Sequence, residues 1–374
     1  MLKSLFLQNF RNYEEFDLDF DDPVGLTYFI GDNGQGKTNI LEAIYLLALS
    51  KSFRTSSVEN MIKWDREFCR IRGDFDLDQK QVELECFLGK SPHPRRVLKK
   101  DQIKISAQNF VGNIQIVFFQ PEDINMLYLG PDLRRKYLDI INVQIDRKYY
   151  SALRKFKRLK EQRNAILKGI KEGRTSRSDL QIWDEQFANE AAIIYLERAK
   201  TIEFLNERLS KLYQEISGGN ESLKIDYKNT LNLDYSILME ATNLKEIIRM
   251  ELEKALPKDL VSEHTSIGPH RDDLDFVLNE IKIASHASRG EFRSIVLACK
   301  LAEIEFYTNK GESKPLLLLD DVFSELDHQR QVFLLERVKN YQTFITTTKD
   351  SAVINQEKLA PGRFVEIVNG NLSN

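Results

Sequence analysis

The stretch that decides the fold is Gly31-Asp32-Asn33-Gly34-Gln35-Gly36-Lys37-Thr38. It follows the apolar run 26–30 and precedes a helix that apolar residues at helical spacing predict from Lys37 onward. Strand, glycine-rich loop and helix form the context that the pattern GxxxxGK[ST] requires for phosphate binding. Glycines let consecutive backbone N–H groups turn toward phosphate oxygens, and the helix adds the positive end of its dipole. The stretch therefore predicts an α/β nucleotide-binding fold.

Every residue of this phosphate loop is a candidate ligand of ATP. The candidates are Gly31, Asp32, Asn33, Gly34, Gln35, Gly36, Lys37 and Thr38. Lys37 is expected to reach the β and γ phosphates as a catalytic residue, and the Thr38 hydroxyl to ligate Mg²⁺. The alternative is a chance glycine turn before a helix, which ordinary glycine usage makes a rare accident in one chain.

A second candidate site follows the leucine run 316–319, which ends in Asp320 and Asp321. A buried parallel strand delivers acids in this way to the carboxyl edge of a sheet. We expect Asp320 to hold Mg²⁺ through its hydrated shell and Asp321 to orient or deprotonate the attacking water, both as catalytic residues. A core strand followed by a solvated acidic turn is the alternative.

The chain has 374 residues, of which 42% are hydrophobic and 30% charged, enough for a large core. Period-two alternation predicts strands at 3–8, 15–20, 68–77, 82–88 and 115–119. Long, charged, helical segments run from Pro131 to about residue 218, and a further helix over 243–256 precedes Pro257. We predict a nucleotide-binding head, residues 1–130 and 258–374, split by a mainly helical lobe, residues 131–257.

Composition also bounds where the protein acts. The first ten residues have neither a basic start nor a long apolar stretch, so we expect a cytoplasmic protein without a membrane partner. Cys69, Cys86 and Cys299 share no CxxC spacing, which indicates reduced structural thiols. The net charge of -3 neither favours nor excludes a polyanionic partner.

A basic run inside the predicted lobe indicates DNA binding. Between residues 147 and 177 only Glu161 and Glu172 are acidic. The basic members are Arg147, Lys148, Arg154, Lys155, Lys157, Arg158, Lys160, Arg163, Lys168, Lys171, Arg174 and Arg177. Such a helical arm suits phosphate contacts that do not read sequence. A solvated helix face balanced by acids elsewhere is the alternative.

With these motifs in place, the chain resembles the ABC ATPases of the SMC and Rad50 type and, among them, the bacterial RecF family. The resemblance covers nearly the whole chain. Its pieces are residues 7–13 (LQNFRNY), 31–44, 51–55, 121–123 with Arg134 and Arg135, 265–273 (TSIGPHRDD) and 320–327. It implies an ABC-type P-loop ATPase head with mixed sheets, interrupted by a helical lobe that serves as a DNA-clamping arm.

The resemblance also assigns further site residues. Ser288 and Gly290, at the start of a predicted helix, would meet the γ-phosphate bound by the opposite subunit, although an ordinary helix N-cap is an equal interpretation. Glu291 and Phe292 stand where the family usually has glutamines, and Thr346 where transport ABC proteins carry a switch histidine. Gln120 occupies the place of a metal-sensing glutamine, with a plain strand-end residue as the alternative.

Two shorter segments also have predicted roles. Arg11 and Asn12 either touch phosphate or ribose, or form a surface turn. His270 and Arg271 are expected to hold the structure together rather than to act on a substrate.

The function implied by the resemblance is an ATP-dependent homodimeric clamp on duplex and on gapped or single-stranded DNA. It would act in recombination, repair and replication, with RecR and RecO, to load a recombinase and to support the SOS response. Turnover of ATP would be slow, and nuclease activity is not expected. The alternatives are a RecF-like ATPase of phage defence, a small-molecule kinase or transporter motor, and an SMC-like tether, for which the insertion is too short.

Overall fold

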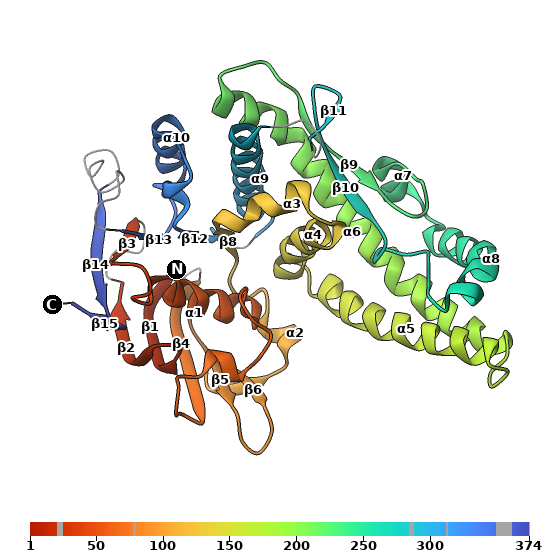
Figure 1. Cartoon of the computed structure of the whole chain (residues 1–374), viewed down its shortest axis with the longest axis horizontal. Coiled ribbons are helices and arrows are strands. Elements are labelled where there is room, and N and C mark those ends of the chain that lie inside the picture. The colour runs from red at the N-terminus through yellow and green to blue at the C-terminus, as the bar shows by residue number, and fades with distance from the viewer. Residues whose placement is uncertain (21–24, 78–79, 284–287, 312, 349–360, 374) are drawn as a thin grey trace. The chain divides into compact units, whose positions relative to one another are not determined.

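The computed structural model describes residues 1–20, 25–77, 80–283, 288–311, 313–348 and 361–373 (Figure 1). The chain forms two compact units. Unit 1 consists of Met1–Asp123 and Glu303–Asn374, and unit 2 of Ile124–Ala302. The phosphate loop and the acid pair both belong to unit 1, whereas the basic run belongs to unit 2.

The first sheet of unit 1 is antiparallel throughout and has the strand order β2-β1-β4-β5-β6-β7. Alternation places Leu5 and Leu7 of β1 on its buried face, as the sequence predicts. The strands are β1 (Leu2–Phe10), β2 (Tyr13–Asp19), β4 (Phe68–Leu77), β5 (Lys80–Gly89), β6 (Arg95–Lys100) and β7 (Ile103–Ile105).

The second sheet of unit 1 has the order β15-β14-β3-β13-β12-β8, and all neighbours are parallel except β15 and β14. Its strands are β3 (Leu26–Ile30), β8 (Ile116–Phe119), β12 (Leu316–Asp320), β13 (Thr343–Thr347), β14 (Gly362–Val368) and β15 (Asn371–Leu372). The leucines of β12 are buried on both faces, which is why this strand has no polar alternation.

Helix α1 (Lys37–Leu49) contacts strands of both sheets, β4 and β5 of the first and β13, β12 and β8 of the second. Every residue from Ile40 to Leu49 is buried, as expected of a helix enclosed on all sides. The start of α1 therefore lies at the carboxyl edge of the parallel sheet, where β3 ends. Unit 1 also holds α2 (Ala107–Phe110) and α10 (His328–Val338).

Unit 2 is built on two long helices, α5 (Arg147–Lys171) and α6 (Ser178–Ser217), which pack along each other, with α8 (Leu244–Ser262) against both. A small antiparallel sheet, β11-β10-β9, packs against α6 and α4 (Pro131–Ile145). Its strands are β9 (Leu223–Lys228), β10 (Asp273–Leu278) and β11 (Ile281–Lys282). Helices α3 (Asn125–Tyr128) and α7 (Tyr235–Glu240) complete the unit, and α9 (Arg289–Lys310) runs from unit 2 into unit 1. Among the described residues, no helix is long and apolar enough to span a bilayer.

One predicted boundary is wrong. The helix expected to end before Pro257 continues through this proline to Ser262. A proline in a helix removes one backbone hydrogen bond. Tertiary bonds outweigh this loss, because buried Asp259, two residues later, accepts hydrogen bonds from Arg163 and Ser266.

Residues 258–302, which the sequence assigns to the head, cluster with unit 2 in the structure. The reason is strand pairing, since β10 pairs with β9 from the helical segment. The functional division into ATPase head and DNA-clamping arm stays a prediction.

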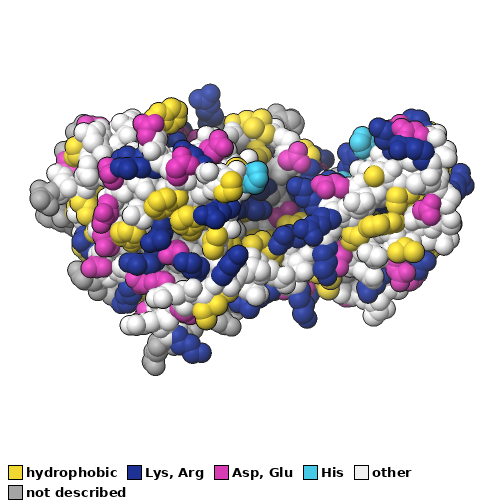
Figure 2. Space-filling view, turned by 90° about the horizontal axis from the view of Figure 1, so that it is seen from below, with side chains coloured by type: hydrophobic (Ala, Val, Ile, Leu, Met, Phe, Trp, Pro, Cys, Tyr) yellow, Lys and Arg dark blue, Asp and Glu magenta, His cyan; other side chains and the backbone are white. Residues whose placement is uncertain are grey.

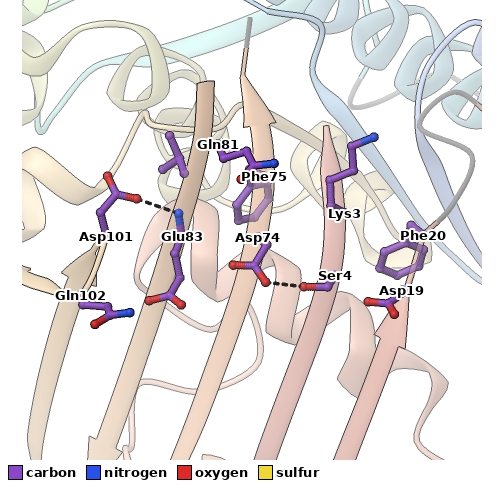
Figure 3. Close-up of a pocket in the computed structure, with 11 residues that line it drawn as sticks. Lys3, Ser4, Asp19, Phe20, Asp74, Phe75, Gln81, Glu83, Asp101 and Gln102 are labelled. Carbon is purple, nitrogen blue, oxygen red and sulfur yellow. Dashed lines mark hydrogen bonds between the residues drawn. The ribbon is translucent and has the colours of Figure 1, made fainter. Parts of the chain in front are cut away.

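A hollow of about 750 Å³ lies on the first sheet of unit 1 (Figure 3). The charged groups of its lining are the carboxylates of Asp19, Asp74, Glu83 and Asp101 and the ammonium of Lys3. Lys3 lies near the beginning of β1, whereas Asn12, which contacts the phosphate loop, follows its end. At about 3.3 Å of rise per residue these ends are roughly 25 Å apart. The hollow is therefore separate from the phosphate loop, and its carboxylates would repel an anion.

Candidate functional site: a nucleotide-binding edge

The phosphate loop connects β3 to α1 through a backbone that needs glycine. Gly36 has φ +113°, and a Cβ there would lie 2.5 Å from Asn12 Nδ2. Gly34 has φ +83°, and a Cβ there would meet no atom within 4 Å, so the loop is open on that side. Among the described residues no side chain caps α1, so its first N–H groups are available to an anion. The loop geometry thus suits phosphate, and the binding of ATP by residues 31–38 stays a prediction.

Lys37 lies over this loop. Its Nζ donates hydrogen bonds to the carbonyl oxygens of Gly31, at 2.6 Å, and Asp32, at 2.8 Å. Partial burial lowers the pKa of the Lys37 ammonium, while Asp321, Asp32 and Asp320 oppose this shift. Neutral carbonyls are weaker partners for an ammonium than phosphate oxygens are. The arrangement therefore leaves Lys37 able to transfer to the phosphates of a bound nucleotide.

The structure brings Thr38 and Asp320 together from opposite ends of the sequence. Asp320 Oδ1 accepts a hydrogen bond from Thr38 Oγ1 at 2.8 Å and a second from Thr346 Oγ1 at 2.7 Å. Burial raises the pKa of the Asp320 carboxyl, and the bonds from Thr346 and Thr38 oppose that shift. Because Thr38 gives its hydrogen to Asp320, the lone pairs of its oxygen remain for a cation. An oxygen-only set of this kind suits Mg²⁺.

The other two predicted residues lie at the same edge. Asp321 has φ +50°, and its backbone N–H donates to Thr346 Oγ1 at 3.0 Å. Gln120 directly follows β8. Phe119 of β8 pairs with Leu319 of β12, so the next residues, Gln120 and Asp320, lie side by side at the carboxyl ends of these two strands. The Gln120 Nε2 donates a long, 3.4 Å hydrogen bond to Asp123, which leaves its amide oxygen as the candidate metal ligand.

A hydrogen-bond network that the sequence did not predict braces the loop. Arg11 donates from Nε and Nη2 to Glu42, whose side chain is fully buried in α1. Asn12 Nδ2 donates to the Gln35 carbonyl at 2.9 Å, and Tyr13 Oη to the Gly36 carbonyl at 3.0 Å. Arg11 is thus committed to a carboxylate inside the protein, and its place is structural. The available signal was an acid, Glu42, within the apolar part of a predicted helix.

Ser288 and Gly290 lie in unit 2, at the start of α9. The Glu291 N–H donates to Ser288 Oγ at 3.2 Å, and the Ser288 N–H donates to Glu291 Oε2 at 2.7 Å. This reciprocal pair is a capping box. The hydrogen bonds from Ser288 lower the pKa of the Glu291 carboxyl. The N-cap interpretation thus describes the geometry, and a role of Ser288 and Gly290 toward ATP stays a prediction.

One member of the predicted DNA-contacting run is not available to DNA. The Arg163 side chain is fully buried, with Asp184 at 2.7 Å from Nε and Asp259 at 2.7 Å from Nη1. Its Nη1 also donates to Thr265 Oγ1 at 3.0 Å. Including Arg163 in the run was therefore wrong, because helical spacing turns this position toward α6 and α8 instead of toward solvent.

The segment 265–273 is part of the same interior. His270 Nε2 lies 3.0 Å from the Thr265 carbonyl oxygen, and its ring packs against Phe156 and Phe187. Arg271 Nε donates to the same carbonyl at 3.3 Å. These contacts agree with the structural role predicted for both residues.

The outer face of α5 is, by contrast, strongly basic. Figure 2 shows Lys and Arg side chains, with hydrophobic ones between them, on the right-hand part of the molecule. Its exposed basic residues are Arg147, Lys148, Arg154, Lys155, Lys157, Arg158, Lys168 and Lys171. Lys155 pairs with Glu190 and Lys171 with Glu263. The face consisting of Arg147, Lys148, Arg154, Lys157 and Arg158, here called the α5 basic face, has no ion pair among the described residues.

The fold and the loop define the class of protein. The family model for an AAA ATPase domain matches residues 1–287. An Smc head domain from Pyrococcus furiosus, solved bound to the C-terminal domain of ScpA, shares the fold at TM-score 0.56 and 17% identity, covering 100% of this chain and 95% of that one. The chain is an ABC-type P-loop ATPase, as predicted.

Similarity over the full length then gives the family. The DNA replication and repair protein RecF of Streptococcus suis (strain 05ZYH33) is 38% identical over 93% of this chain and 92% of its own length. The solved structure of the recombination mediator protein RecF-ATP superposes at TM-score 0.87 with 34% identity, covering 100% of this chain and 98% of that one. The chain belongs to the RecF family.

Proposed function

We propose that this protein is an ATP-dependent DNA clamp of recombinational repair and replication maintenance. The observation that carries the proposal is the pairing, in one chain, of an ATP-binding edge with an unpaired basic helix face. Its relatives' names support the same role. Because chromosomal DNA is the proposed substrate, we place its action in the cytoplasm.

The nucleotide edge is proposed to bind ATP with Mg²⁺. Backbone N–H groups of residues 31–38 hold the phosphates, Lys37 exchanges its carbonyl partners for phosphate oxygens, and Asp321 orients the attacking water. Thr38, Asp320 and Gln120 would hold Mg²⁺, which would neutralise phosphate charge. Hydrolysis is proposed to be slow, because its role is to reopen a clamp.

ATP is proposed to close a homodimer. In this arrangement Ser288 and Gly290 of one subunit would meet the γ-phosphate held by the other subunit's loop, at the positive end of the α9 dipole. ATP would then stabilise the dimer through its higher affinity for the closed state. For the same reason, the affinity for DNA would depend on whether ATP is bound.

The α5 basic face is proposed to contact the DNA backbone. From Arg147 to Arg158 it covers about 16 Å of helix at 1.5 Å per residue. A duplex presents one phosphate charge per about 1.7 Å of axis, so several phosphates fall within this length. The face reads charge and not bases, which suits duplex and gapped or single-stranded DNA alike. We further propose that the protein acts with RecR and RecO, that it helps to load a recombinase, and that it supports the SOS response.

The test is sedimentation of the protein with gapped duplex DNA, with and without ATP and Mg²⁺. ATP is expected to produce a DNA-bound dimer. Lys37→Met should abolish it by removing the phosphate contact, and Ser288→Arg by obstructing the opposite subunit's nucleotide.

A matched control is Lys104→Met, which makes the same change at an exposed lysine of β7 and should leave the dimer intact. A wild-type protein that stays monomeric on DNA at every nucleotide state would refute the clamp. A DNA-bound dimer that forms equally well with Lys37→Met would refute the dependence on ATP.

A further inference from the structure

Thr346 stands between the two acids of the nucleotide edge. Its hydroxyl donates to Asp320 Oδ1 at 2.7 Å and accepts from the Asp321 N–H at 3.0 Å. The residue is 1% exposed. A hydroxyl offers one hydrogen to donate and two lone pairs to accept. The single Oγ1 of Thr346 therefore uses its donor on one acid and an acceptor site on the next.

The bond to Asp321 matters because of the backbone there. Asp321 has φ +50° and ψ +25°, a left-handed conformation that residues with a Cβ disfavour. The Asp321 carbonyl oxygen in turn accepts from Ser324 Oγ at 2.7 Å. Hydrogen bonds at both ends thus hold the turn that presents the Asp321 carboxylate.

Thr346 itself is fixed by the sheet. β13 lies between β3 and β12, where Thr346 pairs with Phe29 on one side and with Asp320 on the other. A group carried by a central strand is held more precisely than one on a loop. Thr38 donates to the same Asp320 oxygen from α1. Among the described residues, the hydroxyl of Thr346 is the one that bonds to both acids.

We propose that Thr346 is a positioning residue for ATP hydrolysis, whose hydroxyl holds the Asp320 carboxylate and the Asp321 turn in one arrangement. The proposal rests on the nucleotide chemistry proposed above and is independent of DNA binding. In this proposal Thr346 aligns the Asp320 and Asp321 carboxylates of its own subunit.

The first test compares Thr346→Val, which has the same shape without the hydroxyl, with Thr346→Ser, which keeps it. Loss of a group that orients metal ligands typically costs 10–100-fold in activity or metal affinity. At saturating Mg²⁺, Thr346→Val should lower kcat at least about tenfold with KM for ATP within about twofold. Thr346→Ser should keep kcat within about threefold of wild type, since its hydroxyl can make both bonds.

A second readout does not require turnover. Binding of a fluorescent ATP analogue is measured in EDTA and in Mg²⁺. Thr346→Val should bind it in EDTA as wild type does, because the phosphate loop is unchanged. The gain in affinity on adding Mg²⁺ should be smaller than in wild type, by roughly tenfold or more.

The matched control is Thr343→Val on the same strand. Thr343 is fully buried, and the single hydrogen of its hydroxyl is shared between the carbonyl oxygens of Val338, at 3.3 Å, and Tyr341, at 3.1 Å, away from the acids. It should lower thermal stability without changing kcat or the Mg²⁺-dependent gain.

Three results would overturn the proposal. The first is that Thr346→Val keeps the kcat and the Mg²⁺-dependent gain in affinity of the wild type. The second is that Thr346→Ser is as slow as Thr346→Val, and the third is that Thr343→Val loses as much kcat as Thr346→Val. A wild-type protein that hydrolyses no ATP would refute the proposed ATPase function instead, and the binding measurement would still decide the place of Thr346.

Discussion

The interior of unit 2 and the α5 basic face use the same residue type, on the same helix, in opposite ways. Arg163 is buried between Asp184 and Asp259, whereas Arg154 and Arg158 are exposed and have no ion pair among the residues described. In the interior, the Arg163 guanidinium has two carboxylates of the protein as fixed partners. On the face, the charges have water as their partner and can exchange it for phosphate. Pairing and burial, and not residue type, separate a structural arginine from a binding arginine.

The largest effect is expected in the interior. Arg163→Ala leaves the fully buried Asp259 and the half-buried Asp184 without their cation, and breaking a buried pair in this way typically costs about 3–5 kcal/mol in free energy of unfolding. For a domain of this size that loss corresponds to a Tm lower by at least about 6 °C. Thermal unfolding monitored by circular dichroism measures it.

The matched control for this change is Arg158→Ala on the same helix, which should stay within about 0.5 kcal/mol of wild type. Equal losses of stability in the two variants would show that burial does not distinguish them.

A smaller effect, on binding instead of stability, is expected at the face. Arg154→Glu combined with Arg158→Glu should weaken binding to duplex DNA about tenfold or more at physiological salt. The slope of log affinity against log salt concentration should fall by about 2, because two phosphate contacts are lost. Salt titration by fluorescence anisotropy gives both quantities.

Lys245→Glu with Arg249→Glu makes the same change of charge on the exposed side of α8 and serves as control. If that pair weakened DNA binding as much, net charge and not the α5 basic face would be responsible.

The smallest effect concerns His270, in the interior. Burial lowers its pKa to about 4. Between pH 6.5 and 4 the unfolded chain therefore binds a proton that the folded chain does not, so stability is lost as pH falls through this window. His270→Gln, which can still donate to Thr265, should remove about 1 kcal/mol of this loss at pH 5.5. Urea unfolding at pH 7.5 and 5.5 provides the comparison.

Asp272 acts in the opposite direction in the same range, since burial raises its pKa to about 6 and a protonated carboxyl favours the folded state at low pH. The difference between wild type and His270→Gln isolates the histidine. An unchanged pH dependence in the variant would mean that His270 is protonated in the folded protein.

Local sequence was sufficient to predict the phosphate loop, because strand, glycine turn and helix are neighbours in the chain. It also predicted that Asp320 and Asp321 end a buried strand, since a leucine run without polar alternation is itself the signal of burial on both faces. These predictions need no knowledge of partners far away in the sequence, and the fold class followed from them. The RecF family was a resemblance that rested on further segments as well, 265–273 among them.

What only the tertiary structure decided is which distant side chains meet. Three features depend on a partner far along the chain or on another element. Thr38 and Thr346 donate to the same Asp320 oxygen, Glu42 braces the phosphate loop, and α8 continues past Pro257. The basic run 147–177 is the plainest case, because its residues look alike in sequence. Burial between α6 and α8 makes Arg163 structural, and exposure leaves the α5 basic face for a ligand.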